Sequence, residues 1–290
     1  MTSTALILGS SGQVGVALQR TAPSSVRVVA HDLDQTDIRD RAAITSAIAE
    51  AKADVVINCA GFTNVDGAEA NPDEAMQANG VAPGVIAEVA LRAHARLIHI
   101  STDYVFDGRS HLPYRPDAAV APLNVYGATK LEGERRVLAA APESVVVRTA
   151  WVHSGGGNNF VRTAVRLLTA GTPMRVVDDQ IGTPTQATSL ARALWQIADR
   201  RDLRGLLHFT DAGVASWFDV ATAVFDTLQG AGRVGGGASV APIGSDQFRT
   251  PARRPHFSVL DKHESWNAIG FVPSQWAVGI IESTHELMNA

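Results

Sequence analysis

The alternation of short apolar runs with helix-like segments is the feature that most limits the folds open to this chain. Apolar runs of strand length occur at residues 5–8, 26–30, 55–57, 97–100 and 145–147, and helical spacing occurs between them, at 14–21, 42–51, 74–92 and 125–140. Strands that are apolar at every residue are typical of a parallel sheet covered on both faces. Because such connections are right-handed, we predict a doubly wound, parallel Rossmann-type α/β sheet over residues 1–150.

The pattern loosens after residue 150. Glycine clusters at 155–157 and 235–237 indicate loops, residues 190–198 and 218–228 have helical spacing, and 206–209 resembles one more strand. We therefore predict a smaller C-terminal substrate-binding lobe, mainly residues 151–290, from which a segment at about 178–210 returns to the main sheet.

Composition narrows the class of protein. The 290 residues carry a net charge of −4, so no basic field would attract nucleic acid or an acidic membrane surface. Cys59 is the single cysteine, which excludes an internal disulfide and fits a reducing compartment. We see neither a signal peptide nor an apolar run near the roughly 20 residues that span a bilayer. These features predict a cytoplasmic protein. We expect a monomer or a homodimer.

A glycine-rich turn joins the first predicted strand to the first predicted helix. Gly9, Gly12 and Gly15 have the spacing G-x-x-G-x-x-G, with Gln13 and Val14 between the last two. Glycine allows the backbone to approach a pyrophosphate closely, and the following helix offers free N–H groups and a positive dipole end. The position between strand and helix favours a dinucleotide site over a purely structural turn.

The second predicted strand ends near Asp32, about where a dinucleotide-binding fold needs an acidic ribose ligand. A carboxylate there would accept from a ribose 2′-hydroxyl and repel a 2′-phosphate, which favours NADH. Arg27 and Arg39 lie nearby and leave NADPH open. Asp37 and Ile38 could flank the adenine, although Asp37 could equally cap a helix.

Tyr126 and Lys130 are four residues apart and therefore share one face of a predicted helix. Carbonyl reduction needs a proton donor, and a lysine ammonium together with oxidised nicotinamide would lower the pKa of a tyrosine from about 10. Lys130 could also bind the nicotinamide ribose. Thr102 follows the fourth strand, where α/β sheets bind ligands, and could orient Tyr126, while Asp103 could bind a sugar hydroxyl.

These motifs together resemble the dTDP-4-dehydrorhamnose reductase family of the extended short-chain dehydrogenase/reductase superfamily. The resemblance covers nearly the whole chain. The matching segments are residues 9–15, 61–66, 101–108, 122–134 and 148–152, and in the second lobe 157–160, 179–185 and 250–255.

The resemblance implies reduction of the C4 ketone of dTDP-4-dehydro-L-rhamnose by NADPH or NADH, the last step of dTDP-L-rhamnose biosynthesis. It gives Tyr126 the role of proton donor, with Lys130 and Thr102 as its partners. It places Gly61, Phe62 and Thr63 beside the cofactor, and Thr102, Asp103 and Trp151 beside the sugar. It also implies that Arg253 and Arg254 bind the substrate diphosphate, because guanidinium forks match phosphate oxygens. The competing interpretations are that Trp151 is an ordinary core tryptophan and that one of the two arginines is simply solvated.

Two departures from the family pattern stand out. His153 replaces a common tyrosine, and residues 16–20 lack the carboxylates that link some members through magnesium, so we expect no metal requirement. His94, His99 and His208 show no metal-ligand spacing. Two other functions stay open: reduction of another nucleotide-linked 4-ketosugar, and a non-catalytic regulatory subunit resembling that of methionine adenosyltransferase.

Overall fold

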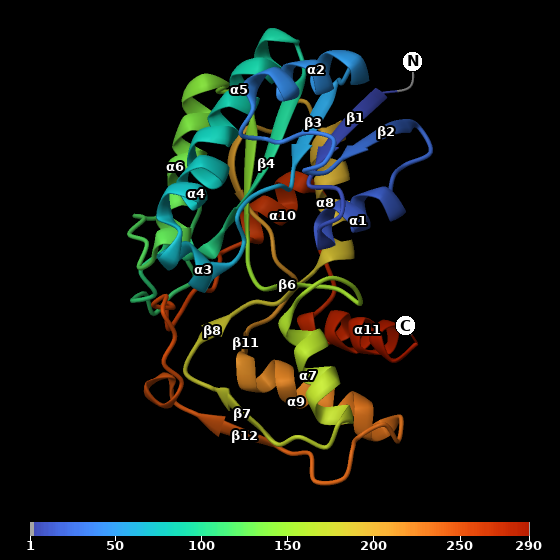
Figure 1. Ribbon diagram of the computed structural model, residues 1–290, viewed down its shortest axis with the longest axis vertical. Coiled ribbons are helices and arrows are strands. Elements are labelled where there is room, and N and C mark those ends of the chain that lie inside the picture. The colour runs from blue at the N-terminus through green and yellow to red at the C-terminus, as the bar shows by residue number, and fades with distance from the viewer. Residues whose placement is uncertain (1–2, 290) are drawn as a thin grey trace.

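A six-stranded parallel sheet forms the upper part of the molecule in Figure 1. The computed structural model describes residues 3–289. The strand order is β10-β5-β4-β3-β1-β2, with β1 (Ser3–Leu8), β2 (Val26–His31), β3 (Val55–Asn58), β4 (Arg96–Thr102), β5 (Val145–Thr149) and β10 (Gly205–His208). All five predicted strands of the first half are present, and the parallel, doubly wound α/β sheet is confirmed.

Helices cover both faces of this sheet (Figure 1). One face carries α1 (Gln13–Arg20), α8 (Ala187–Asp199) and α10 (His263–Ile269), and the other carries α2 (Arg41–Ala51), α5 (Ala82–Arg92) and α6 (Val125–Ala140). Successive side chains of β1 alternate between the two layers: Ile7 packs in the first, Leu6 and Leu8 in the second. This double burial explains why the strands are apolar at every residue.

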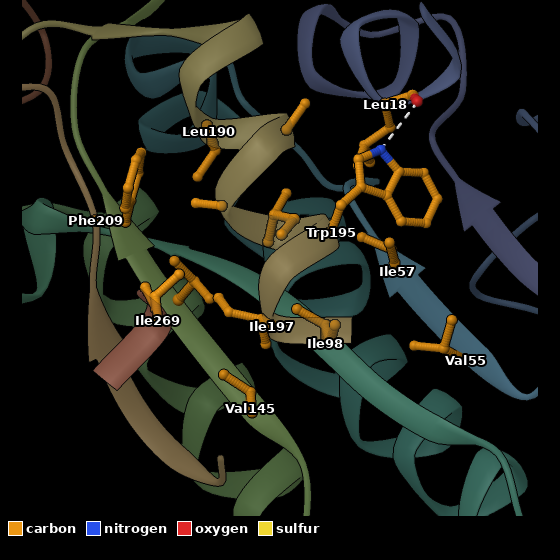
Figure 2. Packing of buried hydrophobic residues seen from close by; sticks show 14 of the residues in the cluster. Leu18, Val55, Ile57, Ile98, Val145, Leu190, Trp195, Ile197, Phe209 and Ile269 are labelled. Atoms are coloured by element: carbon orange, nitrogen blue, oxygen red, sulfur yellow. Dashed lines mark hydrogen bonds between the residues drawn. The ribbon is translucent and has the colours of Figure 1, made fainter. Parts of the chain in front are cut away.

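The first layer is held together across α1 and α8. Figure 2 shows Trp195 of α8 among the buried side chains of β3 and β4. Its indole N–H donates to the carbonyl of Leu18 in α1, at 3.2 Å. A buried tryptophan needs such a partner, and here the partner joins two helices that are distant in sequence.

The predicted helix at 74–92 has a more complex form. It begins as α4 (Pro72–Met76), passes through a π-helical turn (Gln77–Val81) and continues as α5. The short helix α3 (Val65–Ala70), which the sequence pattern did not reveal, precedes it. π-Helical turns are frequent at functional sites, and this one contains the buried Asn79.

The lower part of Figure 1 has a separate apolar core. It contains α7 (Phe160–Thr169), α9 (Trp217–Gly230) and α11 (Trp276–Met288), with three two-stranded sheets: β6 (Val152–His153) with β9 (Thr185–Gln186), β7 (Met174–Val177) with β12 (Val240–Ile243), and β8 (Ile181–Gly182) with β11 (Ala215–Ser216). The chain returns to the main sheet with α8 and β10, and again with α10. The domain limits themselves stay a prediction. No helix within residues 3–289 is long and apolar enough to cross a membrane.

A buried ion pair joins α6 to the sheet. Arg148 of β5 donates to Glu134 of α6 through Nε at 2.8 Å and Nη2 at 2.6 Å, and both side chains are at most 3% exposed. Ser101 of β4 also donates to Glu134, and Arg148 donates to the carbonyl of Pro116. With these partners the two buried charges are compensated, so losing one leaves the other uncompensated.

We predict that Glu134→Gln lowers the free energy of unfolding by about 3–5 kcal/mol, the usual effect of removing one partner from a buried pair. Urea titration measures this. Glu143→Gln is the matched control, because Glu143 pairs with Arg204 on the surface, where both side chains are more than half exposed. That control should lose less than about 1 kcal/mol. Equal, small losses in both variants would contradict the role assigned to the buried pair.

Candidate active site

A cleft of about 640 Å³ lies at the carboxyl edge of the main sheet, where the lower core meets it. Its walls come from the glycine loop, the ends of β3, β4 and β5, the start of α6, and lower-core residues such as Phe160 and Trp217. The structure brings these sequence-predicted residues into its lining: Gly12, Gln13, Val14, Gly15, Gly61, Thr63, Thr102, Asp103, Tyr126, Lys130, Trp151 and Arg254.

The glycine loop lies at the switch point of the sheet, between β1 and β3. Gly9 has a φ of +80°, and a Cβ there would lie 2.7 Å from the backbone nitrogen of Ala60. A Cβ on Gly15 would lie 2.3 Å from the carbonyl oxygen of Gly9. Gly9 therefore allows the tight turn on the side away from the cleft. The N-terminus of α1 faces the cleft, and its first turn has no acidic residue. This arrangement fits the pyrophosphate of a dinucleotide.

Asp32 is tied to the glycine loop. Its carboxylate accepts from the backbone N–H groups of Ser11, at 2.6 Å, and Leu33, at 2.8 Å. Burial alone would raise the pKa of Asp32, but hydrogen bonding with the Ser11 side chain and with these two backbone groups outweighs it and holds the pKa below the ordinary value. The side chain is therefore an anion at neutral pH, beside the entrance to the glycine loop.

Asp37 and Ile38 lie outside the cleft lining. Asp37 forms a two-pronged ion pair with Arg39, at 2.8 Å, and Ile38 is buried in the core beside α2. The capping interpretation of Asp37 is wrong, because Asp40 caps α2 by accepting from the N–H of Ala42. Their contact with an adenine stays a prediction.

Asn79 supports the segment that follows β3, and the sequence analysis missed it. Its amide accepts from the backbone N–H of Phe62 at 2.8 Å and donates to the Phe62 carbonyl at 2.9 Å. A Cβ on Gly61 would lie 2.7 Å from the Asn79 side chain. Phe62 thus lies outside the lining while Gly61 and Thr63 form part of it. An asparagine followed by a glycine within a mostly apolar helical segment was the available signal.

The start of α6 is fixed against the end of β4. Asn124 caps the helix by accepting from the N–H of Gly127 at 2.8 Å, and a Cβ on Gly127 would lie 2.1 Å from the Tyr104 carbonyl. The helix therefore lies close to the 3₁₀ turn Asp103–Val105, and Tyr126 lines the cleft beside Tyr104, their rings 5.9 Å apart.

Burial changes the pKa values of both Tyr126 and Lys130. Burial raises the pKa of Tyr126 to about 12, and hydrogen bonding with Thr102 offsets only part of this effect. Burial lowers the pKa of Lys130 to about 8, and its ammonium group donates to the carbonyl of Ile100. The protein groups around Tyr126 therefore keep its phenol protonated at neutral pH rather than favouring the phenolate.

Asp103 is a buried carboxyl group in the cleft wall. It accepts from the Thr102 hydroxyl at 3.0 Å, and burial raises its pKa to about 7. Its second oxygen, Oδ2, lacks a hydrogen bond of good geometry within residues 3–289, although the Ser258 side chain also stabilises the carboxylate. A buried oxygen without a partner is costly, so this atom is suited to a ligand hydroxyl.

Trp151 stacks on Trp217, which the sequence analysis missed. The ring centroids are 3.8 Å apart and nearly parallel, at 9°. The backbone of Gly182 lies against the same indole, since a Cβ there would be 2.7 Å from the ring. Trp217 therefore covers one face of Trp151, and both tryptophans line the cleft together with Phe160, Val220 and Ile280. His153 lies nearby, buried, with Nδ1 at 3.0 Å from the Ser283 hydroxyl.

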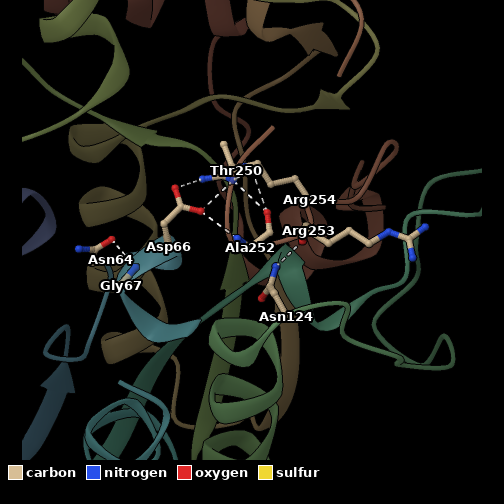
Figure 3. Close-up of polar contacts among 8 residues, drawn as sticks. All are labelled: Asn64, Asp66, Gly67, Asn124, Thr250, Ala252, Arg253 and Arg254. Carbon is tan, nitrogen blue, oxygen red and sulfur yellow. Dashed lines mark hydrogen bonds and ion pairs between the residues drawn. The ribbon is translucent and has the colours of Figure 1, made fainter. Parts of the chain in front are cut away.

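The two arginines lie in different surroundings, as Figure 3 shows. Arg254 lines the cleft and forms an ion pair with Asp66 of α3, at 2.8 Å. Arg253 is exposed and its side chain points away from Arg254, while its carbonyl accepts from Asn124. The structure thus brings only Arg254 of the expected pair into the cleft. Within residues 3–289, no three His, Cys, Asp or Glu side chains form a group that could hold a metal ion.

Known proteins match this chain along nearly its whole length. The model of the RmlD substrate binding domain matches residues 3–289. A dTDP-4-dehydrorhamnose reductase of Mycolicibacterium smegmatis is 44% identical over 98% of this chain and 86% of its own. A probable dTDP-4,6-dihydroxy-2-methyloxan-3-one 4-ketoreductase of Streptomyces antibioticus is 39% identical over 98% of this chain and 96% of its own.

A solved structure gives the same result. The dTDP-4-dehydrorhamnose reductase of Bacillus anthracis, in complex with NADP, is 30% identical and superposes with a TM-score of 0.92, over 99% of this chain and all of that one (100%). The fold, the cleft and these matches agree, and the chain belongs to the RmlD substrate binding domain family.

Proposed function

We propose that the protein is an NAD(P)H-dependent oxidoreductase that reduces the C4 ketone of dTDP-4-dehydro-L-rhamnose to dTDP-L-rhamnose, the last step of dTDP-L-rhamnose biosynthesis. The observation that carries this proposal is the convergence of Tyr126, Thr102 and Lys130 on one cleft with a glycine loop at its other end. The names of the curated relatives support the substrate.

Each residue of the cleft has a separate role in carbonyl reduction. Bound reduced nicotinamide supplies the hydride. Tyr126, kept protonated by burial, donates the proton that neutralises the developing alkoxide. Thr102 holds the carbonyl and the phenol in line, and Lys130 binds the nicotinamide ribose. Asp103 accepts from a sugar hydroxyl, and the Trp151–Trp217 stack packs against the apolar part of the sugar.

Gln13 links the cofactor loop to the opposite wall of the cleft. Its amide oxygen accepts from the Ser154 hydroxyl and from the Asn159 amide, each at 2.9 Å, and its amide nitrogen donates to the Val152 carbonyl. A dinucleotide on the glycine loop would therefore lie under residues 152–159. Such cover excludes water from the reacting atoms.

Either reduced dinucleotide suits the site in this proposal. The Asp32 anion favours a free ribose hydroxyl and hence NADH. The solved Bacillus anthracis relative holds NADP. We therefore propose that the protein uses NADH or NADPH and does not require magnesium. A cytoplasmic location and a monomeric or homodimeric state likewise stay predictions.

A second substrate has one specific observation in its favour. The Streptomyces antibioticus relative carries the name of a 4-ketoreductase for a different dTDP-linked ketosugar. Reduction of another nucleotide-linked 4-ketosugar would use the same proton donor, and only the contacts with the sugar hydroxyls would differ. No observation favours the regulatory-subunit alternative.

We predict that Tyr126→Phe lowers kcat by about 100-fold or more, the usual contribution of a positioned proton donor, with cofactor affinity nearly unchanged. Oxidation of NADH and of NADPH with dTDP-4-dehydro-L-rhamnose, followed by absorbance, measures this. Tyr114→Phe is the matched control, because the Tyr114 phenol donates to Asp107 outside the cleft lining. Full turnover in Tyr126→Phe would refute the assignment.

We predict that Asp103→Asn makes the fold more stable at about pH 8 while weakening substrate binding. The folded pKa of about 7 lies above the ordinary 3.8, so the folded protein binds more protons and loses stability as the pH rises between these values. Each pKa unit corresponds to about 1.4 kcal/mol, so the gain should reach a few kcal/mol. Urea titrations should show the gain shrinking toward about pH 4. A pH-independent difference would contradict this account.

A further inference from the structure

We propose that Asp66 is a positioning residue that fixes the Arg254 guanidinium so that its remaining N–H edge forms a two-pronged site for the substrate's diphosphate. This inference rests on the proposed function, because it assigns the group that recognises the phosphates of a nucleotide-linked sugar. Figure 3 shows Asp66 on α3 facing Arg254, which lies on the segment that leads from β12 back to the main sheet.

Asp66 and its neighbours occupy one end of the guanidinium. The carboxylate oxygens Oδ1 and Oδ2 accept from Nη1 at 3.1 Å and from Nη2 at 2.8 Å. Nη1 also donates to the Thr250 hydroxyl and to the Ala252 carbonyl. The two terminal nitrogens therefore meet protein oxygens on the side that faces α3.

Asp66 leaves the other edge of the guanidinium free. Arginine has five N–H donors, and the hydrogen bonds to Asp66, Thr250 and Ala252 leave Nε and the second proton of Nη2, with the Tyr104 side chain as a further hydrogen-bonding neighbour of the guanidinium. These two donors form a parallel fork that matches two oxygens of a phosphate. Arg254 lines the cleft and Asp66 does not, so the carboxylate lies behind the guanidinium. Tyr104, which contacts Tyr126, also lines the cleft there and places this fork on the side of the reacting sugar.

Both members of the pair are charged. Burial alone would lower the pKa of Arg254, but the hydrogen bond with Asp66 outweighs it and the pKa is raised. The same hydrogen bond lowers the pKa of Asp66. A half-buried ion pair of this kind orients the long arginine side chain. The guanidinium stays charged, and its other edge faces the ligand.

Helix α3 relates this site to the catalytic residues. Asp66 also accepts from the backbone N–H of Ala252 at 3.1 Å, which fixes the arginine segment. One turn later, Glu69 accepts from the N–H of Val125 at 2.8 Å, at the start of α6. The same short helix thus sets the distance between Arg254 and Tyr126, which is the distance between a diphosphate and the reacting carbon of its sugar.

The test is the affinity of the full-length protein for dTDP, measured by titration calorimetry, with NADPH affinity measured in parallel. We expect Asp66→Asn and Arg254→Lys each to weaken dTDP binding about tenfold, the value of one lost charge-assisted contact. NADPH affinity should change less than about twofold, because its phosphates bind at the glycine loop. Asp202→Asn is the matched control, since Asp202 forms a similar two-pronged pair with Arg200 on the exposed surface. It should bind both ligands like the wild type.

Turnover gives a second readout. Asp66→Asn should raise KM for the nucleotide sugar about tenfold with kcat within about twofold, as expected for lost binding rather than lost chemistry. Asp66→Glu, which keeps the charge, should recover part of the affinity, and it serves as the test if Asp66→Asn does not fold.

Unchanged or tighter dTDP binding in Asp66→Asn would overturn the inference, because the carboxylate would then be idle or competing with the phosphates. Equal losses for dTDP and NADPH would also overturn it, since they would mean a general collapse of the cleft. If dTDP binding behaves as expected but the wild type does not reduce dTDP-4-dehydro-L-rhamnose, the diphosphate site stands and the proposed sugar fails.

Discussion

The buried ion pair between Glu134 and Arg148 is the interaction on which the site depends most. It joins the middle of α6 to β5, and Ser101, which precedes Thr102, donates to the same glutamate. On that helix Lys130 lies about one turn before Glu134 and Tyr126 a little more than two turns before it. The pair therefore fixes the rotation and height of α6 against β5 and against β4, the strand that ends in Thr102. Buried pairs rarely add stability over apolar packing, so we infer that this pair acts mainly by fixing the position of α6 on the sheet.

The same edge of the sheet concentrates the groups that are costly to bury. Lys130, Asp103 and Tyr126 all have pKa values displaced toward their neutral forms by burial. Such a cleft is a poor place for isolated charges and a good one for a neutral proton donor and for ligand hydroxyls. The surrounding glycines allow the cleft walls to pack this closely, since Gly9, Gly15 and Gly127 each lie where a side chain would meet backbone atoms.

Most of the fold could be predicted from sequence because double burial makes each strand continuously apolar. The glycine loop and the Tyr126–Lys130 pair were equally readable, since their chemistry depends on local spacing. Contacts between distant segments were not. The Trp151–Trp217 stack, the Asn79 bridge and the Asp66–Arg254 pair join residues 66, 17 and 188 positions apart, and no local pattern marks them. The effect of burial on the pKa of Tyr126 could not be predicted either, because spacing does not show how deeply a side chain is buried.

The central claim is that this cleft delivers hydride to the C4 carbon of a dTDP-linked ketosugar. Reduction with NADPH deuterated at the transferring position, followed by NMR of the sugar product, tests it most directly. The account predicts deuterium on sugar C4 and none elsewhere in the product. A reduced sugar without deuterium at C4, or no reduced sugar despite bound cofactor and nucleotide, would contradict it.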